Sequence, residues 1–144
     1  MSFKRPESVL VVIYDHHQQV LLLQRLDDPE FWQSVTGTME VQETPFDTAL
    51  REVWEETGID IIQQGYRLED HQQINHYPIR SAWRYRYAPD ITHNKEHVFS
   101  LKVDPGQSVM LTEHSAYQWL KMGQAAEKVW SQSNRQAILE WVRS

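Results

Sequence analysis

Cysteine is absent from this sequence, and its absence excludes several kinds of site. A chain of 144 residues without cysteine has no disulfide scaffold, no thiolate ligand for zinc or an iron–sulfur cluster, and no thiol nucleophile. Long apolar runs are also missing. The longest run near the N-terminus, Val9–Tyr14, is too short for a signal-peptide core and far shorter than the about 20 residues of a membrane helix. We therefore expect a soluble cytoplasmic protein without a membrane partner.

Positive charge is scarce as well. The chain has 14 lysine and arginine residues against 20 aspartate and glutamate residues, which gives a formal net charge of −6. Nucleic acid polymers are bound by dense lysine and arginine, so a nucleic acid partner is not expected. If the partner is a smaller polyanion, something other than the side chains must supply the positive charge.

The remaining composition is that of one globular domain. Hydrophobic residues make up 40% of the chain and charged residues 24%. Prolines and glycines are scattered, and no linker, repeat or low-complexity stretch divides the sequence. We expect residues 1–144 to form a single domain with a sizeable core.

Hydrophobic patterning predicts strands mixed with helices. The run Ser8–Tyr14 is typical of a strand buried on both faces, and the polar residues after it indicate a hairpin turn. Further strands are expected at Val20–Gln24, Ile59–Ile62, Tyr66–Ile74, Ser81–Tyr87 and His97–Val103. The tail has a mostly helical pattern, at Ala116–Leu120, Gln124–Trp130 and Ser133–Val142. This order is not a strict βαβ alternation, so it favours a mixed sheet with helices packed on it.

The clearest local prediction is a helix over Pro45–Thr57. Thr44 is a good N-cap, proline suits the first helical position, and Asp47 complements the positive end of the helix dipole. Gly58 is a good terminator. One face of this helix is apolar at a spacing of about 3.6 residues, so that face is expected to pack on the sheet.

Three glutamates crowd one patch of this helix. Glu52, Glu55 and Glu56 are at positions i, i+3 and i+4, where like charges repel one another. A bound Mg²⁺ ion would reverse the sign of that interaction, because it prefers oxygen ligands and keeps positions open for water and phosphate. The alternative is an ordinary solvated acidic face. Arg51 is adjacent and is expected to brace one of the carboxylates.

The wider spacing distinguishes these two interpretations. From Gly37, five residues precede Glu43 and seven more precede the run Arg51-Glu52-Val53-Trp54-Glu55-Glu56-Thr57-Gly58-Ile59. This pattern resembles the Nudix box of the Nudix hydrolase family. We expect Gly37 to allow a turn before the helix and Glu43 to hold Arg51.

The resemblance implies a fold and a reaction. The fold is an α/β (α+β) structure, namely an α/β/α sandwich around a mixed β-sheet. The reaction is Mg²⁺-dependent hydrolysis of a nucleoside diphosphate linked to another moiety, with Mn²⁺ as the alternative ion. The residues assigned to catalysis are Arg51, Glu52, Glu55, Glu56 and Glu113, and all of these glutamates are candidate metal ligands. The general base is either a glutamate of the box or Glu113, which is otherwise a further ligand or a surface acid.

Segments outside the box resemble a narrower, bacterial branch of the family. They include Phe31–Gly37, Arg84–Pro89, Thr112–His114 and Ser133–Ile138. That branch acts on dihydroneopterin triphosphate in folate synthesis and releases pyrophosphate and the monophosphate. The positions that correspond to its substrate contacts are Lys4, Arg25, Thr36, Tyr77, Pro78, Ile79, Arg80 and Ser131. Trp32 or Trp83 is a candidate for stacking on the ring, although core packing explains most tryptophans equally well.

Two other functions remain open at this point. One is a housecleaning Nudix hydrolase that acts on dATP, 8-oxoguanine nucleotides or other nucleoside triphosphates, because the box does not determine the base. The other is a non-catalytic Nudix module that binds a nucleotide, although such a module is expected to lose a box glutamate. In each case the partner is a small-molecule phosphate compound, and the protein is a monomer or a small homo-oligomer.

Overall fold

The fold is organised around β1 (Glu7–Asp15), a strand buried on both faces. In the computed structural model, which describes residues 3–143, alternate residues of β1 enter two separate cores. Val9 and Val11 face one side and Leu10 and Val12 face the other, and all four are buried. This confirms the prediction from the apolar run that begins at Ser8.

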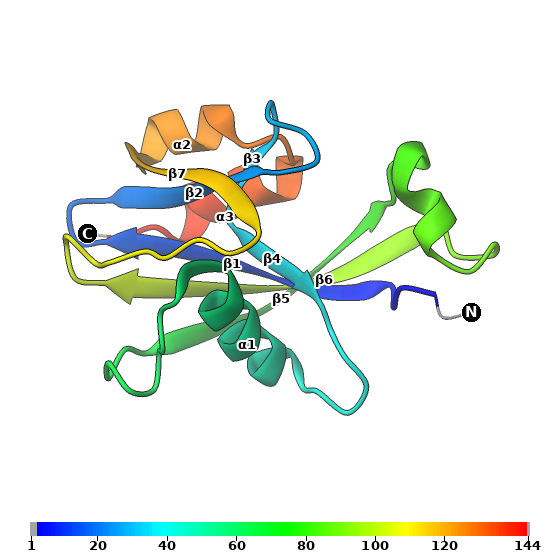
Figure 1. The fold of residues 1–144 in the computed structure, drawn as a ribbon, viewed down its shortest axis with the longest axis horizontal. Coiled ribbons are helices and arrows are strands. Elements are labelled where there is room, and N and C mark those ends of the chain that lie inside the picture. Colours follow the sequence, from blue (N-terminus) through cyan, green and yellow to red (C-terminus); the bar gives the residue numbers. More distant parts are fainter. Residues whose placement is uncertain (1–2, 144) are drawn as a thin grey trace.

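Within residues 3–143, eleven elements follow one another in sequence. Figure 1 shows their arrangement. They are β1, β2 (Gln19–Arg25), β3 (Trp32–Gln33), β4 (Val35–Thr38), α1 (Pro45–Thr57), β5 (Leu68–Pro78), the 3₁₀ helix η1 (Ser81–Arg86), β6 (His93–Val103), β7 (His114–Lys121), α2 (Met122–Lys128) and α3 (Gln132–Trp141).

The sheet is mixed and forks next to β1. Its main path runs β3-β2-β1-β6-β5, with β1 and β6 parallel and the other pairs antiparallel. The pairing of β1 with β2 is confined to Tyr14 and Val20. The first half of β1, from Ser8 to Val11, pairs with β4 instead. β7 pairs along the outside of β2.

Two helical layers cover the sheet (Figure 1). Ala49 and Val53 of α1 pack in the core on one side, and Ala137 and Ile138 of α3 pack in the core on the other, together with α2. The resulting α/β/α arrangement confirms the predicted fold class. No helix within residues 3–143 is long and apolar enough to span a membrane.

Helix α1 has the predicted bounds. Thr44 accepts a hydrogen bond from the backbone N–H of Asp47, and the Asp47 carboxylate accepts one from the Thr44 N–H, which completes a capping box. Gly58 ends the helix at φ 75°, in the left-handed region that favours glycine.

A buried pair of hydrogen bonds joins α3 to the segment between β3 and β4. Asn134 Oδ1 accepts from the Ser34 N–H at 2.9 Å, and Asn134 Nδ2 donates to Ser34 Oγ at 2.9 Å. The two residues are 100 positions apart in sequence, and both are buried. This pair of hydrogen bonds attaches α3 to the start of β4.

Three sequence predictions of secondary structure were wrong. Ile59–Ile62 forms no strand but leads into a turn, in which Ile59 and Ile61 enter the core below α1. Ser81–Tyr87 contains η1, because its alternating aromatic residues resemble a strand but find no partner strand. Ala116–Leu120 belongs to β7, since pairing with β2 outweighs the helical propensity of its Ala, Gln and Leu residues.

Candidate active site

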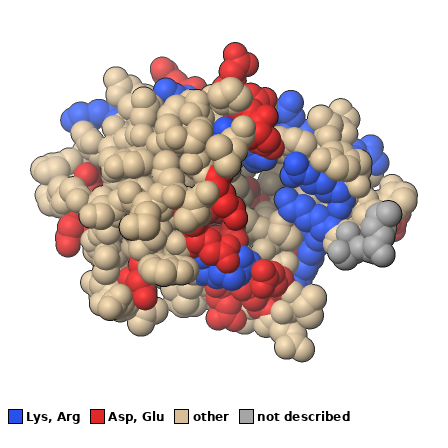
Figure 2. All heavy atoms as spheres, in the orientation of Figure 1, with Lys and Arg blue, Asp and Glu red and all other residues tan. Residues whose placement is uncertain are grey.

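A cavity of about 590 Å³ opens where β4, β6, η1 and the start of α3 meet. Figure 2 shows a hollow in the surface with acidic side chains along one rim and basic side chains along the opposite rim. Inside the cavity, α1 contributes the buried carboxylates Glu52 and Glu56 on the acidic side, which is called the acidic rim below. Lys4, Arg25 and Arg86 contribute to the basic lining.

Glu52 and Glu56 are unusually buried for carboxylates. Glu52 is 9% exposed and Glu56 2% exposed. A Cβ atom on Gly37 would overlap the Glu52 carboxylate, so glycine is required here to make room for the side chain. Because the φ of Gly37 is not in the left-handed region, the expected role in a turn was wrong, and the reason for glycine is space.

The electrostatics of these two carboxylates are unfavourable without a cation. Burial raises the pKa of Glu56 well above its ordinary value, and the neighbouring Glu52 and Glu113 raise it further. Burial also raises the pKa of Glu52. Glu56 Oε1 has no hydrogen-bond partner among the described residues. The nearest cation candidate there is His114 Nε2, at 3.8 Å, but burial lowers the pKa of this imidazole and disfavours its charged form. A buried acceptor of this kind fits a hard metal ion.

The glutamates predicted to bind a metal do not converge on one point. Within residues 3–143, no three His, Asp or Glu side chains converge closely enough to hold an ion. Glu113 lines the cavity from the loop before β7 but is exposed. The site therefore offers two fixed carboxylates on α1 and a third on a surface loop.

Arg51 holds the loop before α1 against the helix. Its Nε donates to Glu43 Oε2 at 2.7 Å, and another of its nitrogens donates to Glu43 Oε1 at 2.9 Å. The same guanidinium donates to Glu52 and, at 3.2 Å, to Glu55 Oε2. Hydrogen bonding from Arg51 lowers the pKa of Glu43 to about 2. Arg51 thus positions Glu52 as expected, without lining the cavity itself.

The basic rim gathers cations from distant parts of the chain. Burial lowers the pKa of Lys4, and the nearby Arg86 and Arg25 lower it further. Arg25 is fixed by two hydrogen bonds of 2.7 Å to the Asp27 carboxylate and lies 4.8 Å from the centre of the Trp83 ring. Mutual repulsion among these cations favours an anionic ligand in the cavity.

An aromatic cluster forms one wall of the cavity. The Arg80 guanidinium lies 4.6 Å from the Phe31 ring, 5.1 Å from Trp83 and 5.5 Å from Trp130. Trp83 lines the cavity, as the stacking prediction requires. Trp32 does not line it and packs instead beside the core under α2 and α3.

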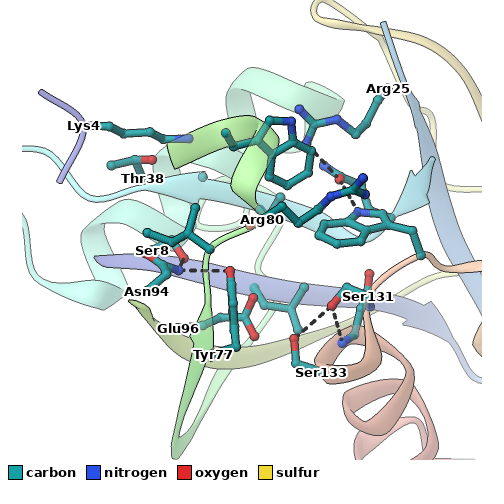
Figure 3. Close-up of a pocket in the computed structure, with 18 of the residues that line it drawn as sticks. Lys4, Ser8, Arg25, Thr38, Tyr77, Arg80, Asn94, Glu96, Ser131 and Ser133 are labelled. Carbon is teal, nitrogen blue, oxygen red and sulfur yellow. Dashed lines mark hydrogen bonds between the residues drawn. The ribbon is translucent and has the colours of Figure 1, made fainter. Parts of the chain in front are cut away.

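The inner end of the cavity is polar (Figure 3). Asn94 Nδ2 donates to Ser8 Oγ at 2.8 Å and to Tyr77 Oη at 3.0 Å, and Glu96 lies beside them. Ser131 caps α3 by accepting from the Asn134 N–H at 3.2 Å. Burial raises the pKa of Tyr77.

Most of the predicted site residues meet at this cavity. Those that line it are Lys4, Arg25, Thr36, Tyr77, Pro78, Ile79, Arg80, Ser131, Glu52, Glu56 and Glu113. Arg51 and Glu55 do not line it, because they are paired with each other outside. Their assigned roles, like those of the lining residues, remain predictions.

Sequence reasoning missed several lining residues. They include Ser8, Trp130, Arg86, Asn94 and Glu96. A signal existed for the last two, since Asn94 and Glu96 alternate with outward residues at the start of β6, on the face that becomes apolar at Val98. Polar residues at inward positions of a strand mark a site that needs polar atoms.

The chain is similar to known proteins over nearly its whole length. The family described as NUDIX domain matches residues 4–142. The dihydroneopterin triphosphate diphosphatase of Haemophilus influenzae is 46% identical over 143 residues, which are 99% of this chain and 90% of that protein. The protein of the same name from Escherichia coli K12 is 48% identical over 141 residues, which are 97% of this chain and 94% of that protein.

The fold of this chain is also similar to that of a solved structure. The structure of the E. coli dihydroneopterin triphosphate pyrophosphohydrolase superposes with a TM-score of 0.94 at 47% sequence identity. The match covers 99% of this chain and 98% of that chain.

Proposed function

Because this chain belongs to the Nudix family, we propose that it is a Mg²⁺-dependent pyrophosphohydrolase that converts dihydroneopterin triphosphate into dihydroneopterin monophosphate and pyrophosphate. The observation that carries the proposal is one cavity with buried carboxylates on one rim and cations on the other. Near-full-length similarity to two proteins named for this activity supports it.

The carboxylates Glu52 and Glu56, joined by Glu113, are the residues that would hold the ion. The orphaned Glu56 oxygen and the burial of both helix glutamates support this assignment. When bound, Mg²⁺ neutralises charge on phosphate oxygens and lowers the pKa of a bound water. Mn²⁺ is the alternative ion, because it accepts the same oxygen ligands.

The basic rim would bind the phosphates. Lys4, Arg25 and Arg86 supply charge along the cavity, and Arg25 is held in one orientation by Asp27. Fixed cations neutralise a triphosphate and keep its anhydride bond oriented toward the acidic rim. Arg51 does not contact the substrate in this proposal but keeps Glu52 in place.

The reaction adds one water across the anhydride between the α- and β-phosphates. The water oxygen bonds to one of the two phosphorus atoms of this anhydride, and the bond between that phosphorus and the bridging oxygen breaks. The bridging oxygen leaves on the other phosphorus, so the products are dihydroneopterin monophosphate, pyrophosphate and one proton. The acidic rim offers carboxylates to accept this proton. Glu113 is the exposed member, from which the proton reaches solvent.

The context of the reaction belongs to the same proposal. Residues 1–144 act as a single domain, as a monomer or a small homo-oligomer, on a dissolved small-molecule triphosphate in the cytoplasm. The product serves folate synthesis.

Steady-state kinetics test the proposal. With Mg²⁺ present, kcat/KM for dihydroneopterin triphosphate should exceed that for each deoxynucleoside triphosphate at least about tenfold, because the ring must contribute specific binding. Pyrophosphate, rather than phosphate, should be the released product. Equal efficiency on all deoxynucleoside triphosphates would instead indicate a housecleaning hydrolase. Binding of nucleotides without any release of pyrophosphate would indicate a non-catalytic module.

A further inference from the structure

Glu96 is a buried carboxylate that the proposed hydrolysis does not use. It lies in β6, is 4% exposed and lines the inner end of the cavity. Glu96 alternates with Val98, which packs in the core under α2 and α3, so its side chain lies on that side of the sheet. The carboxylates of α1 approach the cavity from the opposite side.

Only neutral polar groups surround Glu96 among the described residues. Asn75 Nδ2 donates to Glu96 Oε1 at 3.2 Å, and the hydroxyls of Ser133 and Tyr77 lie beside it (Figure 3). Burial raises the pKa of Glu96, which these polar groups offset only in part. A buried carboxyl group with no counter-ion depends on hydrogen-bond donors, which Asn75, Ser133 and Tyr77 supply in part and a ligand can add to.

Asn94 contributes a second acceptor at the same place. Both hydrogens of its amide nitrogen are engaged, by Ser8 Oγ at 2.8 Å and by Tyr77 Oη at 3.0 Å. Its Oδ1 atom is therefore the part of the side chain that remains to accept a hydrogen bond. Glu96 and Asn94 thus place acceptor oxygens at this end of the cavity, to which a ligand that presents donors would be complementary.

The distance between the two ends suits a triphosphate with a ring at its far end. Ser8 of β1 is in register with both Thr38 of β4 and Glu96 of β6. Two strand spacings separate β4 from β6, or about 10 Å. Because Gly37 of β4 contacts Glu52, this spacing of about 10 Å separates the backbone beside the acidic rim from the backbone of Glu96.

We propose that Glu96 and Asn94 determine ring specificity by accepting hydrogen bonds from the 2-amino-4-oxopyrimidine edge of the substrate. That edge presents a ring N–H beside an amino group, which matches two carboxylate oxygens. Pterins and guanine share it. Adenine instead presents a ring nitrogen lone pair beside its amino group, which a carboxylate repels. This inference rests on the proposed function for the orientation of the triphosphate.

The first test uses the unaltered protein. dGTP and dITP differ only in the 2-amino group, and dATP presents the opposite edge. These nucleotides are measured as Mg²⁺-dependent substrates or, where turnover is slow, as inhibitors of dihydroneopterin triphosphate hydrolysis. We expect kcat/KM, or the strength of inhibition, to be at least about tenfold higher for dGTP than for dITP and dATP. The reason is that dITP and dATP lose a hydrogen bond to a charged group. Equal values for dGTP and dITP, or a preference for dATP, overturn the proposal.

The second test uses Glu96→Gln, with Glu69→Gln as the matched control on the exposed face of β5. Glu96→Gln should bring kcat/KM for dGTP, or its strength as an inhibitor, close to that for dITP. The same variant should raise KM for dihydroneopterin triphosphate at least about tenfold, with a smaller change in kcat. Glu69→Gln should leave the ratio of dGTP to dITP unchanged. A parallel loss on every substrate, or an unaltered ratio, overturns the proposal. Circular dichroism checks the fold, and if the variant does not fold, the nucleotide comparison decides alone.

The outcomes separate this inference from the proposed function. If dihydroneopterin triphosphate is not hydrolysed but dGTP is favoured over dITP through Glu96, the proposed function fails and the ring inference stands. If dihydroneopterin triphosphate is hydrolysed without any dependence on the 2-amino group, the proposed function stands and the ring inference fails.

Discussion

The lack of a Cβ atom at Gly37 determines where the Glu52 side chain lies on the acidic rim. The glycine leaves the space that the Glu52 carboxylate occupies against β4. Arg51 holds the same carboxylate from the other side. If Glu52 binds the ion as proposed, a carboxylate fixed from two sides requires little rearrangement to do so.

Replacing this glycine should weaken metal binding more than stability. In Gly37→Ala the new methyl group displaces Glu52, so we expect the Mg²⁺ concentration for half-maximal activity to rise about 10–100-fold. Gly123→Ala is the control, because a Cβ there meets nothing within 4 Å. Mg²⁺ titrations of activity for both variants check this. An unchanged Mg²⁺ requirement in Gly37→Ala would show that the position of Glu52 is not limiting.

At the scale of elements, the loop before α1 and the helix act as one braced unit. Two hydrogen bonds join Arg51 to Glu43 across a helical turn and the preceding loop. The capping box fixes the first turn of the same helix. The brace and the cap together define where the helix carboxylates point.

This brace should give stability a specific dependence on pH. The pKa of Glu43 is lowered from 4.5 to about 2 in the fold, so its ionised form stabilises the protein above its ordinary pKa and the contribution is lost as the pH falls toward 2. Glu43→Gln should therefore lower the free energy of unfolding by about 1–2 kcal/mol at neutral pH, allowing for solvent screening. The difference from the unaltered protein should shrink between about pH 5 and about pH 3.

Urea unfolding in EDTA across this pH range measures the effect. Glu40→Gln is the control, because Glu40 is exposed and its nearest oxygen is 3.8 Å from Arg51. We expect little change in that variant at any pH. A constant difference between Glu43→Gln and the unaltered protein would argue against an ionic contribution from Glu43.

Elements with local signals were predictable from sequence, and elements that depend on partners were not. Helix α1 has its cap, proline and terminating glycine within one segment, so its bounds were correct. β7 was predicted to be helical because only pairing with β2, far away in sequence, makes it a strand. η1 was predicted to be a strand because Trp83, Tyr85 and Tyr87 alternate with polar residues. In the fold Trp83 and Tyr87 line the cavity and Tyr85 is exposed, and no strand among the described residues pairs with this segment.

The same distinction applies to the site. The helix glutamates follow from spacing within the box, whereas Glu96 becomes significant only when β6 is paired beside β1. The substrate positions taken from the family resemblance do meet at the cavity, including the segment Tyr77–Arg80. Arg86 has no local pattern that identifies it, since its place beside Lys4 depends on how η1 folds back.

At the scale of the whole molecule, acidic and basic side chains lie on opposite sides of a hollow in the surface (Figure 2). The net charge of −6 alone argued against a polyanionic partner. In the fold, however, the cations Lys4, Arg25 and Arg86 are concentrated at the cavity, and an ion bound to Glu52 and Glu56 would add to them. In the proposed function, this arrangement lets an acidic protein bind a triphosphate, while its net charge predicts weak attraction for long nucleic acids.

The ion should stabilise the whole fold. A ligand that binds only the folded state adds about 2.7 kcal/mol at 100 times its Kd, which corresponds to a rise of about 5–10 °C in Tm for a chain of this size. Thermal melts with increasing Mg²⁺, at constant ionic strength, measure this. Glu56→Gln should abolish the rise and lower kcat at least about 100-fold. A Tm that does not respond to Mg²⁺ would count against binding to the folded apo protein.

The hydrogen bonds between Ser34 and Asn134 also bear on how the protein acquires activity during synthesis. The cavity draws on strands near the N-terminus, on β6 and on the start of α3, so its walls meet only after most of the chain has emerged from the ribosome. Contacts across such long sequence separations form slowly, because loop closure precedes their stabilising effect. A nascent chain that stops before Asn134 lacks at least one residue that lines the pocket, so we expect the proposed activity to begin only after α3 has packed against Ser34.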